Sequence, residues 1–179
     1  MSPPASSREV ILDAAEVVVL EIGARHMTLD AVASRANVSK GGLLYHFPTK
    51  EALLKAMMER FIRQIEETRK KKAKGLKEGP GREIKSLILS VTDRDPKKEQ
   101  IGSALLAAAA HDPELLQPAR DDFRRRLTEI VRSGLNFKRA AVIIFAVHGL
   151  VFSELLSLSH LSIKERNDLI EELLRLADE

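Results

Sequence analysis

Residues 28–50 read TLDAVASRANVSKGGLLYHFPTK, a stretch that holds two short helical patterns separated by a sharp turn. Thr28 and Ser39 are favourable N-cap residues, and each stands directly before one of the two patterns. Asn37, at the turn, is one of the few residue types that tolerate the left-handed backbone conformation needed to join two helices closely. The stretch therefore predicts a helix-turn-helix, with Val38 filling the space between the helices.

The second helix of this stretch begins with Lys40, Gly41 and Gly42. Each early glycine costs about 1 kcal/mol relative to alanine, so the close approach of another molecule is a better explanation than packing within the chain. A helix N-terminus favours anions, and Tyr45 and His46 are able to donate hydrogen bonds to phosphates. We interpret this helix as one that reads the major groove of DNA; an ordinary helical hairpin is the alternative.

The residues on both sides of the stretch favour the DNA interpretation. Lys50 follows Pro48 and Thr49 and is expected at the start of a long helix, beside the position of a phosphate. Residues 8–60 as a whole resemble the N-terminal domain of the TetR family of bacterial transcriptional regulators. The matching positions are residues 11–15, Gly23, Thr28, residues 32–33, residues 36–41 and residues 44–53.

The resemblance to the TetR family implies a set of DNA-facing residues, among which Lys40 and Gly42 are expected to meet base edges. Two positions differ from many members: Asn37 replaces a glycine, and the aromatic residue common at the position of Leu44 stands at Tyr45 instead. The residues that the resemblance places on the DNA surface are Thr28, Ser39, Lys40, Gly41, Gly42, Tyr45, His46 and Lys50.

The composition of the 179-residue chain narrows its structural class. It has no cysteine, 4% aromatic residues and no alternating strand pattern, which predicts an all-α protein without disulfides. No signal peptide is visible, and the longest uncharged stretch, residues 140–153, is too short to span a bilayer, so we expect a cytoplasmic protein that does not associate with membranes. The net charge is +3, but positive and negative residues cancel within residues 1–50, so the DNA interpretation rests on the motif.

Helical periodicity predicts about nine helices in two domains. Residues 1–50 form the expected helix-turn-helix domain, which opens with a capping box at Ser6 and Glu9 and continues into a connecting helix over residues 50–74. Residues 51–179 form the expected ligand-binding and dimerisation domain, a helical bundle. Its further helices are expected over residues 82–92, 97–110, 113–132 and 137–159, and from Ser162 onward.

The resemblance also implies an effector pocket in the larger domain. Its walls would be mostly apolar, which predicts a small, mainly hydrophobic effector. His148 is either a satisfied core histidine or a ligand contact, and each phenylalanine of the set would equally suit the core. The candidate wall residues are Leu87, Leu105, Leu116, Phe123, Phe145, His148 and Phe152.

The last two long helices carry more apolar surface than a monomer needs, and the TetR family pairs these helices between two copies. We therefore expect a homodimer through residues 137–178, which would bring two reading helices onto one near-palindromic operator. The expected interface residues are Val147, Val151, Leu155, Leu158, Leu169 and Leu173.

Together these features predict a sequence-specific transcriptional regulator, a repressor that a small hydrophobic effector releases from double-stranded operator DNA. No metal or cofactor is expected, because none of the five histidines has another histidine three or four residues away. No Ser/His/Asp set is recognisable, so we do not expect an enzyme. Two alternatives remain: a protein–protein adaptor whose helix-turn-helix no longer binds DNA, and a helical lipid or ligand carrier.

Overall fold

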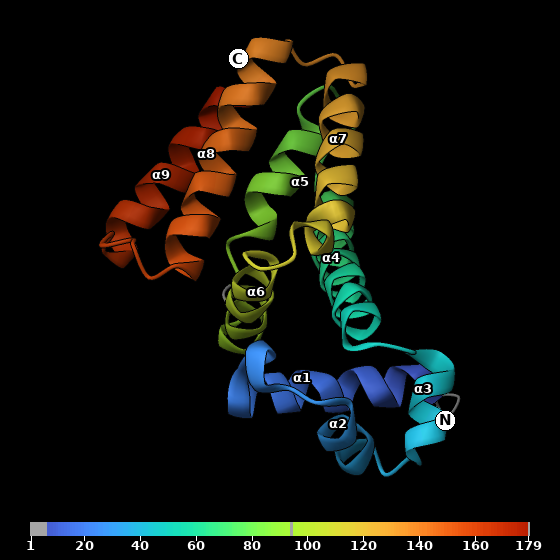
Figure 1. Cartoon of the computed structure of the whole chain (residues 1–179). Helices are drawn as coiled ribbons and strands as arrows, with labels where there is room; N and C mark the ends of the chain where they lie inside the picture. Colours follow the sequence, from blue (N-terminus) through green and yellow to red (C-terminus); the bar gives the residue numbers. More distant parts are fainter. Residues whose placement is uncertain (1–6, 94, 179) are drawn as a thin grey trace. The chain divides into compact units, whose positions relative to one another are not determined.

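A computed structural model of the chain describes residues 7–93 and 95–178, and all regular secondary structure in these ranges is helical (Figure 1). Ser6, and with it the expected capping box, lies outside the described residues. No helix within the described ranges is both long and apolar enough to cross a membrane. The nine α-helices and one 3₁₀-helix of these ranges are α1 (Ser7–His26), α2 (Leu29–Ala36), α3 (Lys40–His46), α4 (Lys50–Lys74), α5 (Arg82–Ser90), α6 (Pro96–Ala109), η1 (Pro113–Leu116), α7 (Gln117–Arg132), α8 (Phe137–Leu155) and α9 (Ile163–Leu176).

Several helix boundaries agree with the sequence prediction. α4 covers the predicted range, and α9 begins with the predicted capping box, in which Ser162 and Glu165 hydrogen-bond reciprocally. Pro113, in contrast, opens a 3₁₀ turn before α7 instead of an α-helix. α8 ends at Leu155, short of the predicted residue 159, and Ser157 adopts the left-handed conformation with φ 55°. The end of an apolar helix is therefore harder to predict from the sequence than a capped start, when no glycine or proline marks that end.

The chain divides into two compact units. The first contains the described residues up to Phe61 together with Lys97–Ala119, and the second contains Ile62–Pro96 and the residues from Arg120 onward. α4 and α7 therefore each contribute to both units. The boundary expected at residue 50 separates a DNA-binding region from a ligand-binding region, whereas these units are defined by compactness alone. The expected boundary therefore stays a prediction.

The first unit positions α3 through a small core. α1 packs against α2, and α2 packs against α3. Ile11 and Leu12 of α1, Val32 of α2 and Leu43 of α3 are completely removed from solvent. Because burying such a side chain contributes about 1.5–3 kcal/mol, these residues hold α2 and α3 in place.

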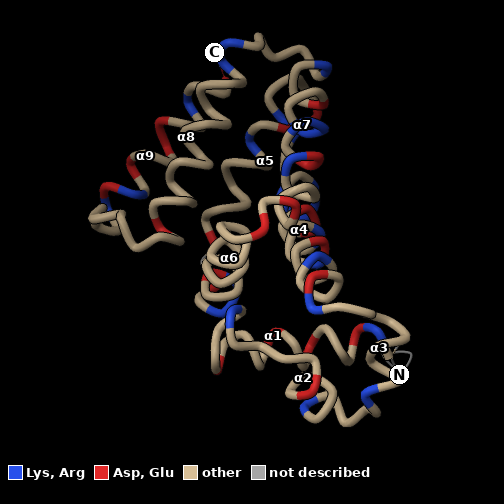
Figure 2. The backbone as a smooth tube through the Cα atoms, in the orientation of Figure 1, with Lys and Arg blue, Asp and Glu red and all other residues tan. Residues whose placement is uncertain are grey.

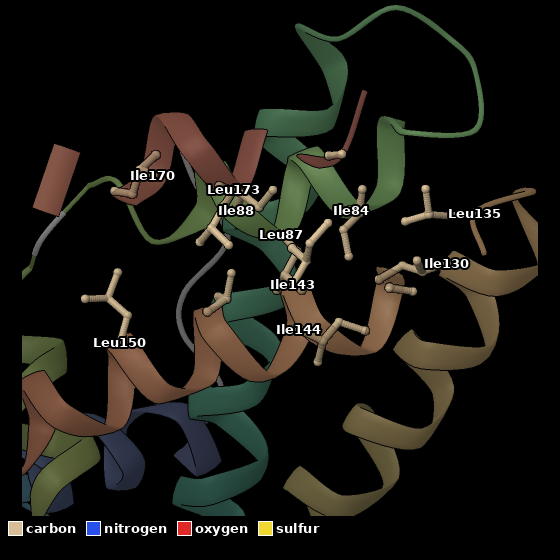
Figure 3. Packing of buried hydrophobic residues seen from close by; sticks show 13 residues of the cluster. Ile84, Leu87, Ile88, Ile130, Leu135, Ile143, Ile144, Leu150, Ile170 and Leu173 are labelled. Atoms are coloured by element: carbon tan, nitrogen blue, oxygen red, sulfur yellow. The ribbon is translucent and has the colours of Figure 1, made fainter. Parts of the chain in front are cut away.

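The second unit has a core of isoleucine and leucine side chains from α5, α7, α8 and α9 (Figure 3). α5 packs against both α8 and α9, and α8 also packs against α9. Ile84 of α5, Ile130 of α7 and Ile143 of α8 are fully buried, and Leu173 of α9 is nearly so. Truncating one of these side chains to alanine would cost about 2–5 kcal/mol, so this cluster determines which faces of the helices point inward.

α8 is apolar almost all round, but only one of its faces is buried. The inward face carries Ile143, Ile144, Val147 and Leu150. The opposite face leaves a row of large apolar side chains exposed, by 46–65% each. This row, which we name the outer stripe, consists of Val142, Phe145, Phe152 and Leu156.

Candidate functional site

The segment between α2 and α3 has the geometry of a tight helix-turn-helix. Thr28 caps α2, where its Oγ1 accepts a hydrogen bond from the Ala31 amide at 3.1 Å. Asn37 ends α2 in the left-handed conformation, with φ 54° and ψ 43°. Ser39 caps α3, where its Oγ accepts a hydrogen bond from the Gly42 amide at 3.0 Å. The sequence prediction of two caps around a left-handed asparagine is confirmed.

α3 presents most of its surface to solvent. Only Leu43 is buried within the helix, whereas Tyr45 is 84% exposed and lies edge-on to His46, with ring centroids 5.1 Å apart. A Cβ added to Gly41 would meet no atom of the chain within 4 Å. Packing within the chain therefore does not require glycine at this position. The close approach of a binding partner to the start of α3 would explain why glycine stands here.

The two lysines assigned to the DNA surface have different surroundings. Lys40 forms an exposed ion pair with Asp30 of α2, with Nζ 2.9 Å from a carboxylate oxygen. Lys50 is half-buried, and its Nζ donates a hydrogen bond to the Arg25 carbonyl oxygen at 2.7 Å. This bond satisfies an acceptor in the last turn of α1, so Lys50 has a structural role that the sequence did not indicate. Its contact with a phosphate stays a prediction.

An arginine of α4 ties this helix to α1. Arg60 lies within ion-pair distance of three carboxylates of α1, those of Glu9, Asp13 and Glu16. Burial raises the pKa of the Glu16 carboxyl, and the positive charge of Arg60 opposes this effect. Because α1 also packs against α2, the ion pairs hold the first half of α4 against the helix that supports the helix-turn-helix. Figure 2 shows that positive and negative residues alternate in this unit instead of forming one basic face.

The seven candidate pocket residues divide between the two units. Leu87 lies in the core of the second unit, whereas Leu105 is buried in the first unit and Leu116 of η1 is half-buried there. The four aromatic members do come together, and we name them the aromatic cluster. The rings of Phe123 and Phe145 have centroids 5.8 Å apart, those of Phe123 and His148 5.3 Å, and those of His148 and Phe152 6.4 Å.

A buried ion pair beside this cluster was missed in the sequence. Arg126 and Asp122 of α7 are 5% and 7% exposed and hydrogen-bond to each other. Asp122 also accepts a hydrogen bond from Arg125, and the Nε of Arg126 has no hydrogen-bond partner. Burial, followed by the charge of Arg126, lowers the pKa of His148. The i, i+4 spacing of Asp122 and Arg126 was the available signal, but in a run of charged residues it is typical of a solvated helix face.

Two of the six residues expected at a dimer interface are buried within the protomer. Val147 and Leu173 lie in the core of their own unit, which leaves them no exposed surface for a partner. Val151, Leu155 and Leu169 are half-buried, and Leu158 alone of the set is exposed. The outer stripe of α8 offers the large apolar surface that was expected of these residues. Figure 2 shows the middle of α8 free of charged residues, whereas charges follow one another along α9.

Two sequence profiles match the chain. Residues 11–57 match that of the bacterial regulatory proteins of the tetR family, and residues 81–178 match that of the tetracyclin repressor-like C-terminal domain. The HTH-type transcriptional regulator BetI of Serratia proteamaculans is 28% identical over 116 residues, which are 60% of this chain. The matched part of this chain spans 57% of the length of that regulator.

Solved structures resemble the chain over almost its whole length. One is described as a TetR-family transcriptional regulator from a Rhodococcus species, with a TM-score of 0.74, 22% identity and coverage of 97% of this chain and 98% of that one. Another, a transcriptional regulator from Streptomyces coelicolor A3(2), has a TM-score of 0.77, 20% identity and coverage of 98% and 100%. At these identities the likeness establishes the fold.

Proposed function

The chain belongs to the TetR family of bacterial transcriptional regulators, and from this premise we propose that it is a repressor that a small, mainly hydrophobic effector releases from its operator. The observation that carries the DNA-binding part is the exposed start of α3, held by caps on both sides of a left-handed Asn37. Such a helix end offers free backbone N–H groups, which favour phosphate. An operator-binding role places the chain in the cytoplasm, with the bacterial chromosome.

In this proposal the polar residues of the helix-turn-helix divide the work of recognition. Lys40 and Gly42 approach base edges, which specify the sequence, and Tyr45, His46 and Lys50 contact phosphates, which fix the register of the protein on the duplex. The remaining members of the predicted surface, Thr28, Ser39 and Gly41, shape the backbone that comes close to the DNA.

Two lysine variants test this surface. Lys40→Ala should cost about 1–3 kcal/mol at the preferred sequence and relax the preference at one base position. Lys50→Ala should weaken binding at all sequences and reduce the slope of affinity against salt concentration by about one. Fluorescence anisotropy over a salt series, with an operator selected from random duplex DNA, measures both effects.

Lys55→Ala is the matched control, because Lys55 is an exposed lysine of α4 outside the proposed surface. Its operator affinity should equal that of the wild type. Thermal unfolding of Lys50→Ala is measured alongside, since this change also removes the hydrogen bond to Arg25. Unchanged affinity in both test variants would contradict the placement. A wild type without salt-dependent DNA binding would favour the adaptor, which the zero net charge of residues 1–50 supports.

We place the proposed homodimer interface on the outer stripe of α8. Its four large apolar side chains are exposed within one protomer, and a contiguous apolar patch of this kind is typical of an interaction surface. A two-fold pairing would bring two reading helices to half-sites about 34–36 Å apart. This assignment replaces the buried Val147 and Leu173 of the original set with residues that have surface to offer.

Control by an effector would act through this paired arrangement. A ligand shifts the DNA-binding equilibrium only by the difference between its affinities for the two arrangements of the dimer. By reciprocity, operator DNA should weaken effector binding by the factor with which the effector weakens DNA binding. Titration of effector into the free protein and into the operator complex measures the two factors, and unequal factors would contradict the linkage.

A further inference from the structure

Arg126 is a buried cation with an unused hydrogen-bond donor. Its side chain is among the most buried polar groups of the second unit, and its Nε has no partner. Buried polar groups are nearly always hydrogen-bonded, so each exception needs an explanation. The carboxylate of Asp122 does not meet the need, because its two oxygens are divided between Arg125 and Arg126. An acceptor oxygen from outside the chain would complete the hydrogen bonding of this guanidinium.

The surroundings of Arg126 are aromatic. Phe123 lies one turn before Arg126 on α7, so the two side chains are neighbours on one face of the helix. The ring of Phe123 contacts Phe145 and His148 of α8, and His148 is close enough to Arg126 for the guanidinium to contribute to lowering its pKa. The same cluster extends to Phe152. A donor for an oxygen therefore lies next to apolar rings.

The outer part of this cluster is uncovered in the protomer. Phe145 is 65% exposed and Phe152 is 46% exposed. The loss of water from such rings is favourable, and a ligand with an apolar body would achieve it. Because arginine forms its strongest hydrogen bonds with ionised acceptors such as carboxylates, a carboxylate suits Arg126 better than an alcohol or a ketone.

We propose that Arg126 and the aromatic cluster bind a small apolar carboxylic acid. Its carboxylate accepts a hydrogen bond from the Nε of Arg126, and its body lies against Phe123, Phe145 and Phe152. The site refines the effector class, and only its regulatory meaning rests on the proposed function. Phe145 and Phe152 also belong to the outer stripe, so a ligand at this site would contact two rings that also face the partner protomer in the proposed dimer.

Direct titration calorimetry with the full chain and three probes tests the ligand class. Naphthalene carboxylate is compared with naphthalene methanol, which has the same ring system without the charge, and with a straight-chain fatty acid. The carboxylate should bind about 10- to 100-fold more tightly than the alcohol, because only the carboxylate offers Arg126 a charged acceptor. An equal affinity for the fatty acid would indicate an aliphatic natural body, and a lower one an aromatic body; both support an acid site. No acid binding at about millimolar concentration, or no preference over the alcohol, would overturn it.

Paired variants locate the site. Arg126→Gln should weaken carboxylate binding about 10- to 100-fold and leave the alcohol unaffected, whereas Arg125→Gln, which changes the exposed partner of the same aspartate, should have little effect. Phe145→Ala should weaken both naphthalene probes by about tenfold. Its control is Phe137→Ala, because Phe137 is a similarly exposed phenylalanine at the start of α8. Equal effects within either pair would refute the location.

The exposed phenylalanine pair keeps the test decisive if Arg126→Gln does not fold. Circular dichroism and thermal unfolding identify that case. Operator binding is measured separately by fluorescence anisotropy in the absence of acid. Acid binding without any DNA binding would uphold this site and contradict the proposed regulator. DNA binding without acid binding would do the reverse.

Discussion

Arg60 of the first unit and Arg126 of the second both pair with carboxylates, and their guanidinium groups are satisfied to different degrees. In the first unit, Arg60 faces three carboxylates of α1, with Oε2 of Glu9 at 3.7 Å and Oε1 of Glu16 at 3.4 Å. In the second unit, Arg126 has Asp122 of its own helix, and that carboxylate is shared with Arg125. One guanidinium nitrogen lacks a hydrogen bond in both cases, but only that of Arg60 has a further carboxylate nearby.

The difference indicates two roles. Arg60 is a structural link between two helices, whereas Arg126 is a candidate ligand-binding residue. Arg60 connects two helices and thereby stiffens the base of the helix-turn-helix. Arg126 connects only two turns of α7 and leaves one buried donor without a partner. The surfaces differ in the same direction: the first unit exposes a polar helix end that suits a charged polymer, whereas the second exposes the apolar outer stripe. The predictions that follow probe this contrast, from the largest expected effect to the smallest.

The largest effect is expected at the outer stripe. Val142→Glu places a charge at a residue that is 62% exposed in the protomer, so folding should be unaffected while the proposed dimer separates. With only one reading helix at a time on the operator, affinity should fall by about 1000-fold, which is the lower end of the usual ratio of specific to non-specific binding. Analytical ultracentrifugation and anisotropy measure the two consequences.

The control for this charge is Val131→Glu, at an exposed apolar residue of α7 outside the stripe. It should remain a dimer with normal operator affinity. A wild type that sediments as a monomer at micromolar concentration, or a dimeric Val142→Glu variant, would remove the stripe from the interface.

The second prediction compares the arginines directly. Arg60→Met should lower the free energy of unfolding by about 3 kcal/mol, because Glu16 is left as a buried carboxylate without its ion pair. Arg126→Met should cost clearly less, since Asp122 retains Arg125. Urea denaturation followed by circular dichroism gives both values. If Arg126→Met proved less stable than Arg60→Met, Arg126 would be the more important structural residue, and the proposed contrast between the two arginines would be wrong.

A smaller effect is expected from releasing Lys40. Asp30→Asn removes the exposed ion pair with Lys40 and one negative charge near the proposed DNA surface. Because exposed pairs contribute at most about 1 kcal/mol, operator affinity should rise by no more than about fivefold. Anisotropy at low and high salt should show a steeper salt dependence than in the wild type. Weaker binding would indicate instead that Asp30 holds Lys40 in its DNA-binding position.

The smallest effect concerns pH. Burial and the charge of Arg126 place the pKa of His148 below its ordinary value of 6.5. The folded protein therefore resists protonation of His148, so its stability is complete above that value and declines as pH falls through the folded pKa. Denaturation between about pH 5 and 8 should show this decline in the wild type and less of it in His148→Gln. Identical profiles would mean that His148 is not in this environment.

The helix-turn-helix of the first unit could be predicted from the sequence because its signals are local. Thr28, Asn37 and Ser39 act within a few residues of themselves, and a cap or a left-handed turn needs no distant partner. The structure confirms each of them, as it confirms the all-helical class. Lys50 shows the limit of local reading, because its hydrogen bond joins residues 25 positions apart in the sequence.

The second unit could not be read in the same way. α8 is apolar on every side, so its sequence has no period that distinguishes Val147, in the core, from Phe145, on the surface. For charged residues the error is the reverse: a pattern typical of a solvated helix face includes side chains that are buried. Arg69 and Arg126 stand among other basic residues that read as solvated, yet both are buried against carboxylates. Only packing against other helices decides which members of such runs turn inward.

Tyr45 gives the molecule a natural optical reporter. The sequence contains one tyrosine and no tryptophan, so the tyrosine emission of the folded chain comes from a single ring that is 84% exposed on α3. Any change of that emission when duplex is added originates at the proposed reading helix and nowhere else in the chain. Quenching spectroscopy therefore follows occupancy of this helix without a dye, a label or an engineered residue, and Tyr45→Phe supplies the dark reference.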